Sequence, residues 1–185
     1  MHIVTQGLVL RETNYKETDK ILTVLTREGG KRTVKARGCR RRNSPLAASA
    51  QLLVWSDMTL FEYRDYISLN EAEALELFWG VRRDVEKLAL CSYFAEVAEA
   101  VAEEGRPDQA LLSLLQQAAR LWREDRGSLL TAGEVLTDRL REAEGAGTGF
   151  PDRALAGMAA GLVTGLLHTL CGIPAILAGI LTQLS

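Results

Sequence analysis

The first 75 residues carry their apolar positions in short runs of the kind that β-strands show. Five runs fit this pattern, and the second of them ends at a Gly-Gly turn signal. The runs are Ile3–Arg11, Asp19–Glu28, 31–37, 51–64 and 65–73. The fourth is a long apolar stretch that predicts one bent strand. Five strands joined by short turns, with a basic surface, predict a small closed barrel of the OB type.

The run at 31–37 alternates in character. Lys35 and Arg37 share one parity, opposite to that of Val34 and Ala36. Because successive side chains of a strand point to opposite faces, we expect Lys35 and Arg37 to stand together on one face. Arg40–Arg42 follow, and we expect them in the loop after this strand.

From about Leu75 the spacing becomes helical. A first helix is predicted through Val81–Val101, ending at Gly105 and Pro107, and a second over Asp108–Glu124 with Asp108 as its N-cap. The pattern therefore predicts an α+β protein. An OB-fold nucleic-acid-binding domain over residues 1–79 precedes a helical domain over residues 80–185.

The last segment, Ala154–Ser185, contains no charged residue. An uncharged apolar stretch of this length is a transmembrane candidate. However, Pro174 and five glycines interrupt it, and Thr164, His168 and Thr169 are mildly polar. We expect a buried pair of helices here, and a membrane tail or an aberrant C-terminus remain the alternatives.

Charge is distributed unevenly along the chain. The net charge is -2, but residues 1–45 hold 11 Lys and Arg against 4 Asp and Glu, or +7. Seven of the twelve residues from Lys31 to Arg42 are basic, and none is acidic. Because fields act over a Debye length of about 8 Å at physiological salt, this run can attract a polyanion although the whole chain is acidic.

The predicted phosphate contacts are these basic residues, with one more at the start of the second strand. They are Lys31, Arg32, Lys35, Arg37, Arg40, Arg41, Arg42 and Lys20. A basic groove binds a nucleic-acid backbone without reading bases. The alternatives for the run are a solvated loop, RNA binding or an acidic protein surface.

Aromatic residues that could stack on bases are sparse near the basic run. We expect Trp55 and Phe61 in the core and Tyr15 and Tyr63 at the surface. Since single-stranded DNA is held by a positive groove together with aromatic stacking, the binding should be mostly electrostatic, with little sequence preference.

The sequence offers little for catalysis or metal binding. The three cysteines, Cys39, Cys91 and Cys171, are scattered without a CxxC pair, and His2 and His168 have no partner constellation. We expect no catalytic residues, no metal, no cofactor and no small-molecule substrate. The N-terminus has no apolar signal core, so no secretion signal is predicted.

Four segments resemble the bacterial recombinational repair mediator family RecO, in order and with matching spacing. They are Gly7–Thr26, Lys35–Leu46, Leu69–Glu99 and Glu103–Leu115, within about the first 120 residues. The resemblance implies an OB barrel followed by a helical domain. It also implies a cytoplasmic, nucleoid-associated protein without enzymatic activity.

The function implied by the resemblance is that of a repair and recombination mediator. Such a protein binds single- and double-stranded DNA, anneals complementary strands and helps to load RecA onto DNA coated with single-stranded DNA-binding protein (SSB). RecR and SSB would be direct partners and RecA an indirect one. Arg82 and Arg83 could then meet an acidic partner tail.

The chain departs from the family pattern at its C-terminal part. Many members carry a four-cysteine zinc module there, and Cys171 alone cannot supply it. The alternative function is a membrane-tethered or partner-binding scaffold with an apolar tail and only weak DNA binding.

Overall fold

The computed structural model describes residues 1–64 and 66–121 of the 185-residue chain. The interpretations of Cys171, of the uncharged segment Ala154–Ser185 and of its possible membrane insertion lie outside the described residues. Among the described helices, none is both long and apolar enough to cross a bilayer.

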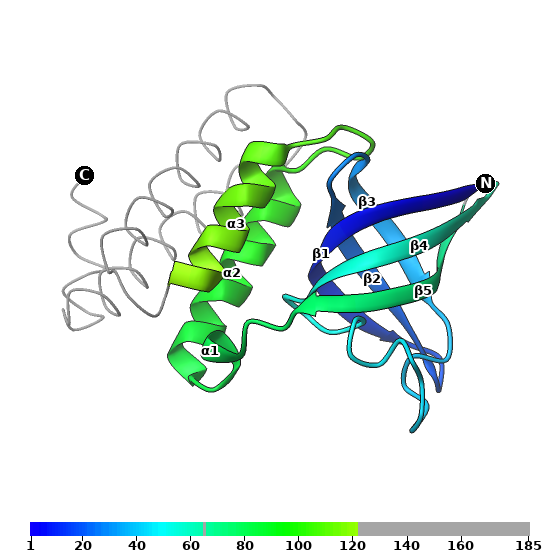
Figure 1. Ribbon diagram of the computed structural model, residues 1–185, viewed down its shortest axis with the longest axis horizontal. Coiled ribbons are helices and arrows are strands. Elements are labelled where there is room, and N and C mark those ends of the chain that lie inside the picture. Colours follow the sequence, from blue (N-terminus) through cyan, green and yellow to red (C-terminus); the bar gives the residue numbers. More distant parts are fainter. Residues whose placement is uncertain (65, 122–185) are drawn as a thin grey trace. The chain divides into compact units, whose positions relative to one another are not determined.

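Five strands wrap into a closed barrel (Figure 1). They are β1 (His2–Tyr15), β2 (Asp19–Thr26), β3 (Gly30–Ala36), β4 (Trp55–Tyr63) and β5 (Tyr66–Glu76). Their order around the barrel is β1-β2-β3-β5-β4, and β4 pairs with β1 to close it. The pairs are antiparallel except β3 with β5, which run parallel. This arrangement confirms the predicted five-stranded OB-type barrel followed by helices.

The fourth strand is shorter than its apolar run suggested. It begins at Trp55 rather than near residue 51. Leu53 has a positive φ of 56°, a conformation that a strand cannot use. Its N–H nevertheless donates to the carbonyl of Val9, and the N–H of Val9 donates to Val54, so this segment lies against β1 at the bulge after Val9.

The barrel core includes residues from the connection between β3 and β4 as well as from the strands. Strand residues such as Val24, Val34 and Met58 are buried. The connection adds Cys39, Leu46 and Ala50 to the same cluster; the full set is Val9, Leu22, Val24, Val34, Ala36, Cys39, Leu46, Ala50, Met58, Leu60 and Leu69. These insertions fix the connection against the end of the barrel.

Within residues 66–121, three helices follow the barrel: α1 (Trp79–Arg82), α2 (Val85–Val101) and α3 (Gln109–Leu121). The N–H of Leu111 donates to Oδ1 of Asp108 at 2.9 Å, which confirms Asp108 as the N-cap of α3. The described residues fall into two compact units. One comprises residues 1–79 and 98–113, and the other comprises residues 80–97 and 114–121.

Within the first unit, the turn between β2 and β3 is joined to the segment after α2. The N–H of Lys31 donates to the carbonyl of Glu103 at 3.2 Å, and Glu104 forms β-bridges with Gly30 and Lys31. Gly30 has a φ of +62°, and a Cβ there would lie 2.1 Å from the carbonyl oxygen of Arg106. Glycine is therefore required at this close approach.

Candidate nucleic-acid interface

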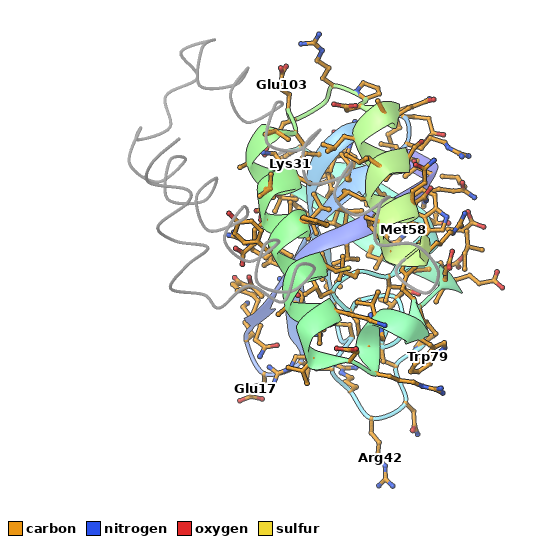
Figure 2. The ribbon with its side chains drawn as sticks, turned by 90° about the vertical axis from the view of Figure 1, so that its left-hand side faces the viewer. Glu17, Lys31, Arg42, Met58, Trp79 and Glu103 are labelled. Atoms are coloured by element: carbon orange, nitrogen blue, oxygen red, sulfur yellow. The ribbon has the colours of Figure 1, made fainter. Side chains whose placement is uncertain are left out.

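Residues 37–46, here called the basic loop, leave the end of β3 and pass over one end of the barrel. Arg37, Arg40, Arg41 and Arg42 are exposed, whereas Cys39 and Leu46 are buried. Figure 2 shows Arg42 extending away from the barrel at this end. The buried residues position the loop, so its four arginines are presented to solvent by a fixed support.

The turn between β1 and β2 holds the basic loop from the other side. The N–H of Arg40 donates to the carbonyl of Thr18 at 3.0 Å, and the Arg40 guanidinium donates to the carbonyl of Lys16 at 3.3 Å. Gly38, which has a φ of +64°, donates its N–H to Oδ1 of Asp19 at 2.8 Å. The loop is thus tied to this turn and to the start of β2 by one hydrogen bond between backbone groups and two that involve a side chain.

The Asp19 carboxylate accepts a hydrogen bond from the basic loop. The hydrogen bond from the Gly38 N–H lowers the pKa of Asp19, and burial opposes that effect. The Thr18 hydroxyl and Lys35, whose Nζ lies 3.5 Å from Oδ2, lower the pKa further. Asp19 is therefore charged at neutral pH and accepts from both the loop and the neighbouring strand.

A groove of about 390 Å³ lies between the basic loop and β5. Its lining combines two guanidinium groups with amide, hydroxyl and apolar side chains: Arg37, Gly38, Arg41, Asn43, Ser44, Pro45, Leu46 and Asn70. Guanidinium groups offer forked donors that match phosphate oxygens, and amides and hydroxyls add neutral hydrogen bonds. The groove can therefore bind a phosphodiester backbone.

The eight predicted phosphate contacts do not form one patch. The structure brings four together around the groove and its rim, namely Arg37, Arg40, Arg41 and Arg42, with Lys35 next to them on β3. Lys20 lies on β2, where its Nζ contacts Glu12 and donates to the carbonyl of Ala50 at 3.1 Å. Lys20 therefore links β2 to Glu12 of β1 and to the connection between β3 and β4.

Lys31 and Arg32 lie toward the start of β3, away from the basic loop. The Nζ of Lys31 donates to the carbonyl of Glu99 at 2.8 Å, and the Arg32 guanidinium lies 3.8 Å from Glu62. In Figure 2, Lys31 lies beside Glu103 at one end of the first unit and Arg42 lies at the other. Basic residues that follow one another closely in the sequence therefore lie in two groups, one at each end of β3.

Exposed tyrosines adjoin the basic residues on both sides of β3. The Lys35 Nζ is 4.7 Å from the centre of the Tyr15 ring, and the Arg37 guanidinium carbon is 5.6 Å from that of Tyr66. Tyr15 and Tyr63 are exposed, as expected from the sequence. Among the predicted core aromatics Trp55 is buried, but Phe61 is only half-buried and packs on His2.

No pattern in the sequence assigned Tyr66 or Asn70 to the interface. Both come beside the basic loop because β5 runs parallel to β3, with Val34 opposite Ile67 and Ala36 opposite Leu69. The available signal was the barrel topology itself, since an OB-type strand order places the start of the fifth strand next to the end of the third.

The remaining predicted site residues lie in the other unit. Arg82 ends α1 and is half-buried, and Arg83 follows it and is exposed.

Within residues 1–64 and 66–121, no group of three or more His, Cys, Asp or Glu side chains could hold a metal ion. Burial raises the pKa of the Cys39 thiol, and it raises that of Cys91 to about 12.

Comparison with known proteins relates this geometry to a family. Residues 1–78 match the family model described as "Recombination protein O N terminal". The chain is 36% identical over 145 residues to a DNA repair protein RecO of Alkaliphilus metalliredigens, covering 78% of this chain and 59% of that protein. It is 33% identical over 129 residues to one of Acetivibrio thermocellus, covering 69% and 51%.

A further relative is the DNA repair protein RecO of Bacillus pumilus, 37% identical over 120 residues, which covers 65% of this chain and 47% of that protein. The chain thus spans about half the length of the curated relatives that it matches. The match begins at the first residue and includes the barrel, the basic loop and the groove. The N-terminal barrel domain of this chain is thus similar to that of the RecO family.

Proposed function

We propose that the chain acts in DNA repair by binding single- and double-stranded DNA non-specifically through the basic loop and its groove. The observation that carries the proposal is the set of four exposed arginines around a groove of about 390 Å³. Guanidinium groups that bind phosphates supply affinity without sequence information. The name of the relatives, DNA repair protein RecO, supports this role.

We further propose that the chain is a recombination mediator. It anneals complementary strands because neutralised backbones can approach and pair without any chemistry. It helps to load RecA onto SSB-coated DNA, with RecR and SSB as direct partners and the cytoplasm as its location. An acidic tail of a partner would meet Arg82 and Arg83. No catalytic residue, cofactor or small-molecule substrate is part of this proposal.

The test replaces Arg40, Arg41 and Arg42 together with alanine. About five phosphate contacts give a slope of log K against log salt near -0.7 per contact for single strands, or roughly -3.5, and the triple variant should flatten it by about 2. Affinity should fall alike for all sequences. The measurement is a fluorescence titration of labelled oligonucleotides at several salt concentrations.

The control variant replaces Arg27 and Arg106, two exposed arginines near the turn between β2 and β3. It removes two positive charges outside the basic loop, so its slope of log K against log salt should stay close to that of the parent. A triple variant with unchanged affinity and slope would show that the basic loop is not the DNA site.

A further inference from the structure

Four residues beside the groove form a tyrosine–arginine cluster, namely Arg37, Tyr63, Arg64 and Tyr66. The rings of Tyr63 and Tyr66 meet edge to face, with centroids 5.9 Å apart and planes at 61°. The Arg64 guanidinium carbon lies 5.2 Å from the Tyr63 ring, and that of Arg37 lies 5.6 Å from Tyr66. All four residues belong to the barrel unit.

The hairpin between β4 and β5 presents these rings outward. Tyr63 pairs directly with Tyr66, and Arg64, with a φ of +50°, makes the turn between them. The next residue of β5, Ile67, packs against the core, so Tyr66 points to the other side of the strand. As whole residues, Tyr63 and Tyr66 remain 47% and 43% exposed. Large aromatic faces are therefore left in water at the barrel surface.

The position of Arg37 connects this cluster to the groove. Its side chain lines the groove and also lies over the Tyr66 ring. A backbone phosphate bound at Arg37 would therefore place the attached nucleotide next to an exposed ring. In a duplex the base faces are covered by their neighbours, so only an unpaired base can use that ring.

We propose that Tyr66, supported by Tyr63, is a stacking site for an unpaired base and would give the interface a preference for single strands over duplex. This inference rests on the proposed function and deepens it, since the arginines would bind any backbone and the ring only an unstacked base. The cation–π contact holds the Arg37 guanidinium over the Tyr66 ring before the strand arrives. Stacking is tolerant of sequence because every base has a π-face.

The experiment uses the full chain and three labelled probes of equal length: an oligo-thymidine, the same backbone with abasic sites, and a duplex. The parent should bind the thymidine probe more tightly than the abasic one. Tyr66→Ala should lower affinity for the thymidine probe about 5- to 160-fold, the range expected for one stacked base. It should leave the abasic probe and the duplex within about twofold.

Two matched variants distinguish the effect of losing the aromatic ring from the effect of losing exposed side-chain surface. Tyr66→Phe keeps the ring and should keep the affinity for the thymidine probe. Leu75→Ala removes a similarly exposed side chain, 46% against 43%, from the far end of the same strand and should change no probe. If Tyr66→Ala fails to fold, the comparison of thymidine and abasic probes on the parent decides, together with cross-linking of a 5-iodouracil probe to the Tyr66 peptide.

The outcomes divide cleanly. Equal binding of thymidine and abasic probes by the parent overturns the stacking site while leaving backbone binding intact. An equal loss on all three probes in Tyr66→Ala also overturns it, because the ring would then act only on the fold. If the parent binds none of the probes, the proposed DNA binding fails first and the stacking site with it.

Discussion

Asp19 joins three segments at the base of the basic loop. Its carboxylate accepts from the N–H of Gly38 at 2.8 Å and lies 3.5 Å from the Nζ of Lys35. Those two residues belong to the loop and to β3, while Asp19 itself begins β2. A single acidic residue thus orients the segment on which the exposed arginines stand.

We expect Asp19→Asn to lower stability in a pH-dependent way. The folded protein holds the pKa of Asp19 below its ordinary 3.8, chiefly through the Gly38 hydrogen bond. A lowered pKa means that this contribution is fully present above pH 3.8 and is lost as pH falls through the folded value. The parent should therefore be more stable than the variant at pH 6, and the difference should shrink below pH 3.8.

The measurement is the urea midpoint of both proteins between pH 6 and pH 2. Glu17→Gln serves as the control, because Glu17 lies in the same turn, is exposed and projects into solvent (Figure 2). A difference between parent and Asp19→Asn that stays constant with pH would contradict the role assigned to the carboxylate.

At the scale of elements, the sequence predicted where the strands lie in the chain. It did not predict which strands pair or which residues come together at their ends. Alternation in the run at 31–37 correctly separated Val34 and Ala36, which are buried, from Arg37, which is exposed. It could not show that Lys31 and Arg42 lie at opposite ends, because that depends on a strand of seven residues, roughly 20 Å long. The pairing of β3 with β5 is set by the whole barrel and leaves no local signal.

The contact between the β2–β3 turn and residues 103–106 contains two glycines with positive φ, Gly30 and Gly105, which can be compared. Gly30→Ala meets both an unfavourable φ of +62° and the carbonyl oxygen of Arg106 at 2.1 Å. Gly105→Ala meets a φ of +73° but no atom within 4 Å. We expect the second to cost about 1–2 kcal/mol from backbone strain alone, and the first at least about 3 kcal/mol.

Hydrogen exchange of the peptides that cover β2 and β3 would measure both variants locally. Greater loss of protection in Gly30→Ala than in Gly105→Ala is the expected order. Equal loss in the two variants would mean that the segment at 103–106 moves away from the turn at little cost.

For the whole molecule, the barrel unit draws on two separate parts of the chain, residues 1–79 and 98–113. The predicted helical domain began at residue 80, and helical periodicity gave no sign that part of this region joins the barrel unit. The contacts responsible are specific. Glu99 pairs with Arg11 at 2.8 Å as an ion pair without hydrogen-bond geometry, and it accepts from the Thr23 hydroxyl at 3.2 Å.

Two glutamates of α2 test this organisation. Glu99→Ala should destabilise the barrel by about 1 kcal/mol, because it removes a partly buried ion pair and a hydrogen bond. Glu96→Ala changes an exposed residue of the same helix and should stay within about 0.5 kcal/mol of the parent. Exchange protection of β1 and β2 distinguishes the two. Equal protection in both variants would show that α2 contributes nothing to the barrel through Glu99.

The bridges between Glu104 and the start of β3 have a consequence for synthesis. The pairing of β3 with β5 covers Val34–Ala36, so the first residues of β3 are met on that side by residues 103 and 104 instead. The ribosome makes residue 104 after residue 79, a difference of 25 positions. At about 5–20 residues per second this takes roughly 1–5 s. During that interval a nascent barrel displays an open strand edge to neighbouring chains, a hazard that ends when Glu104 docks.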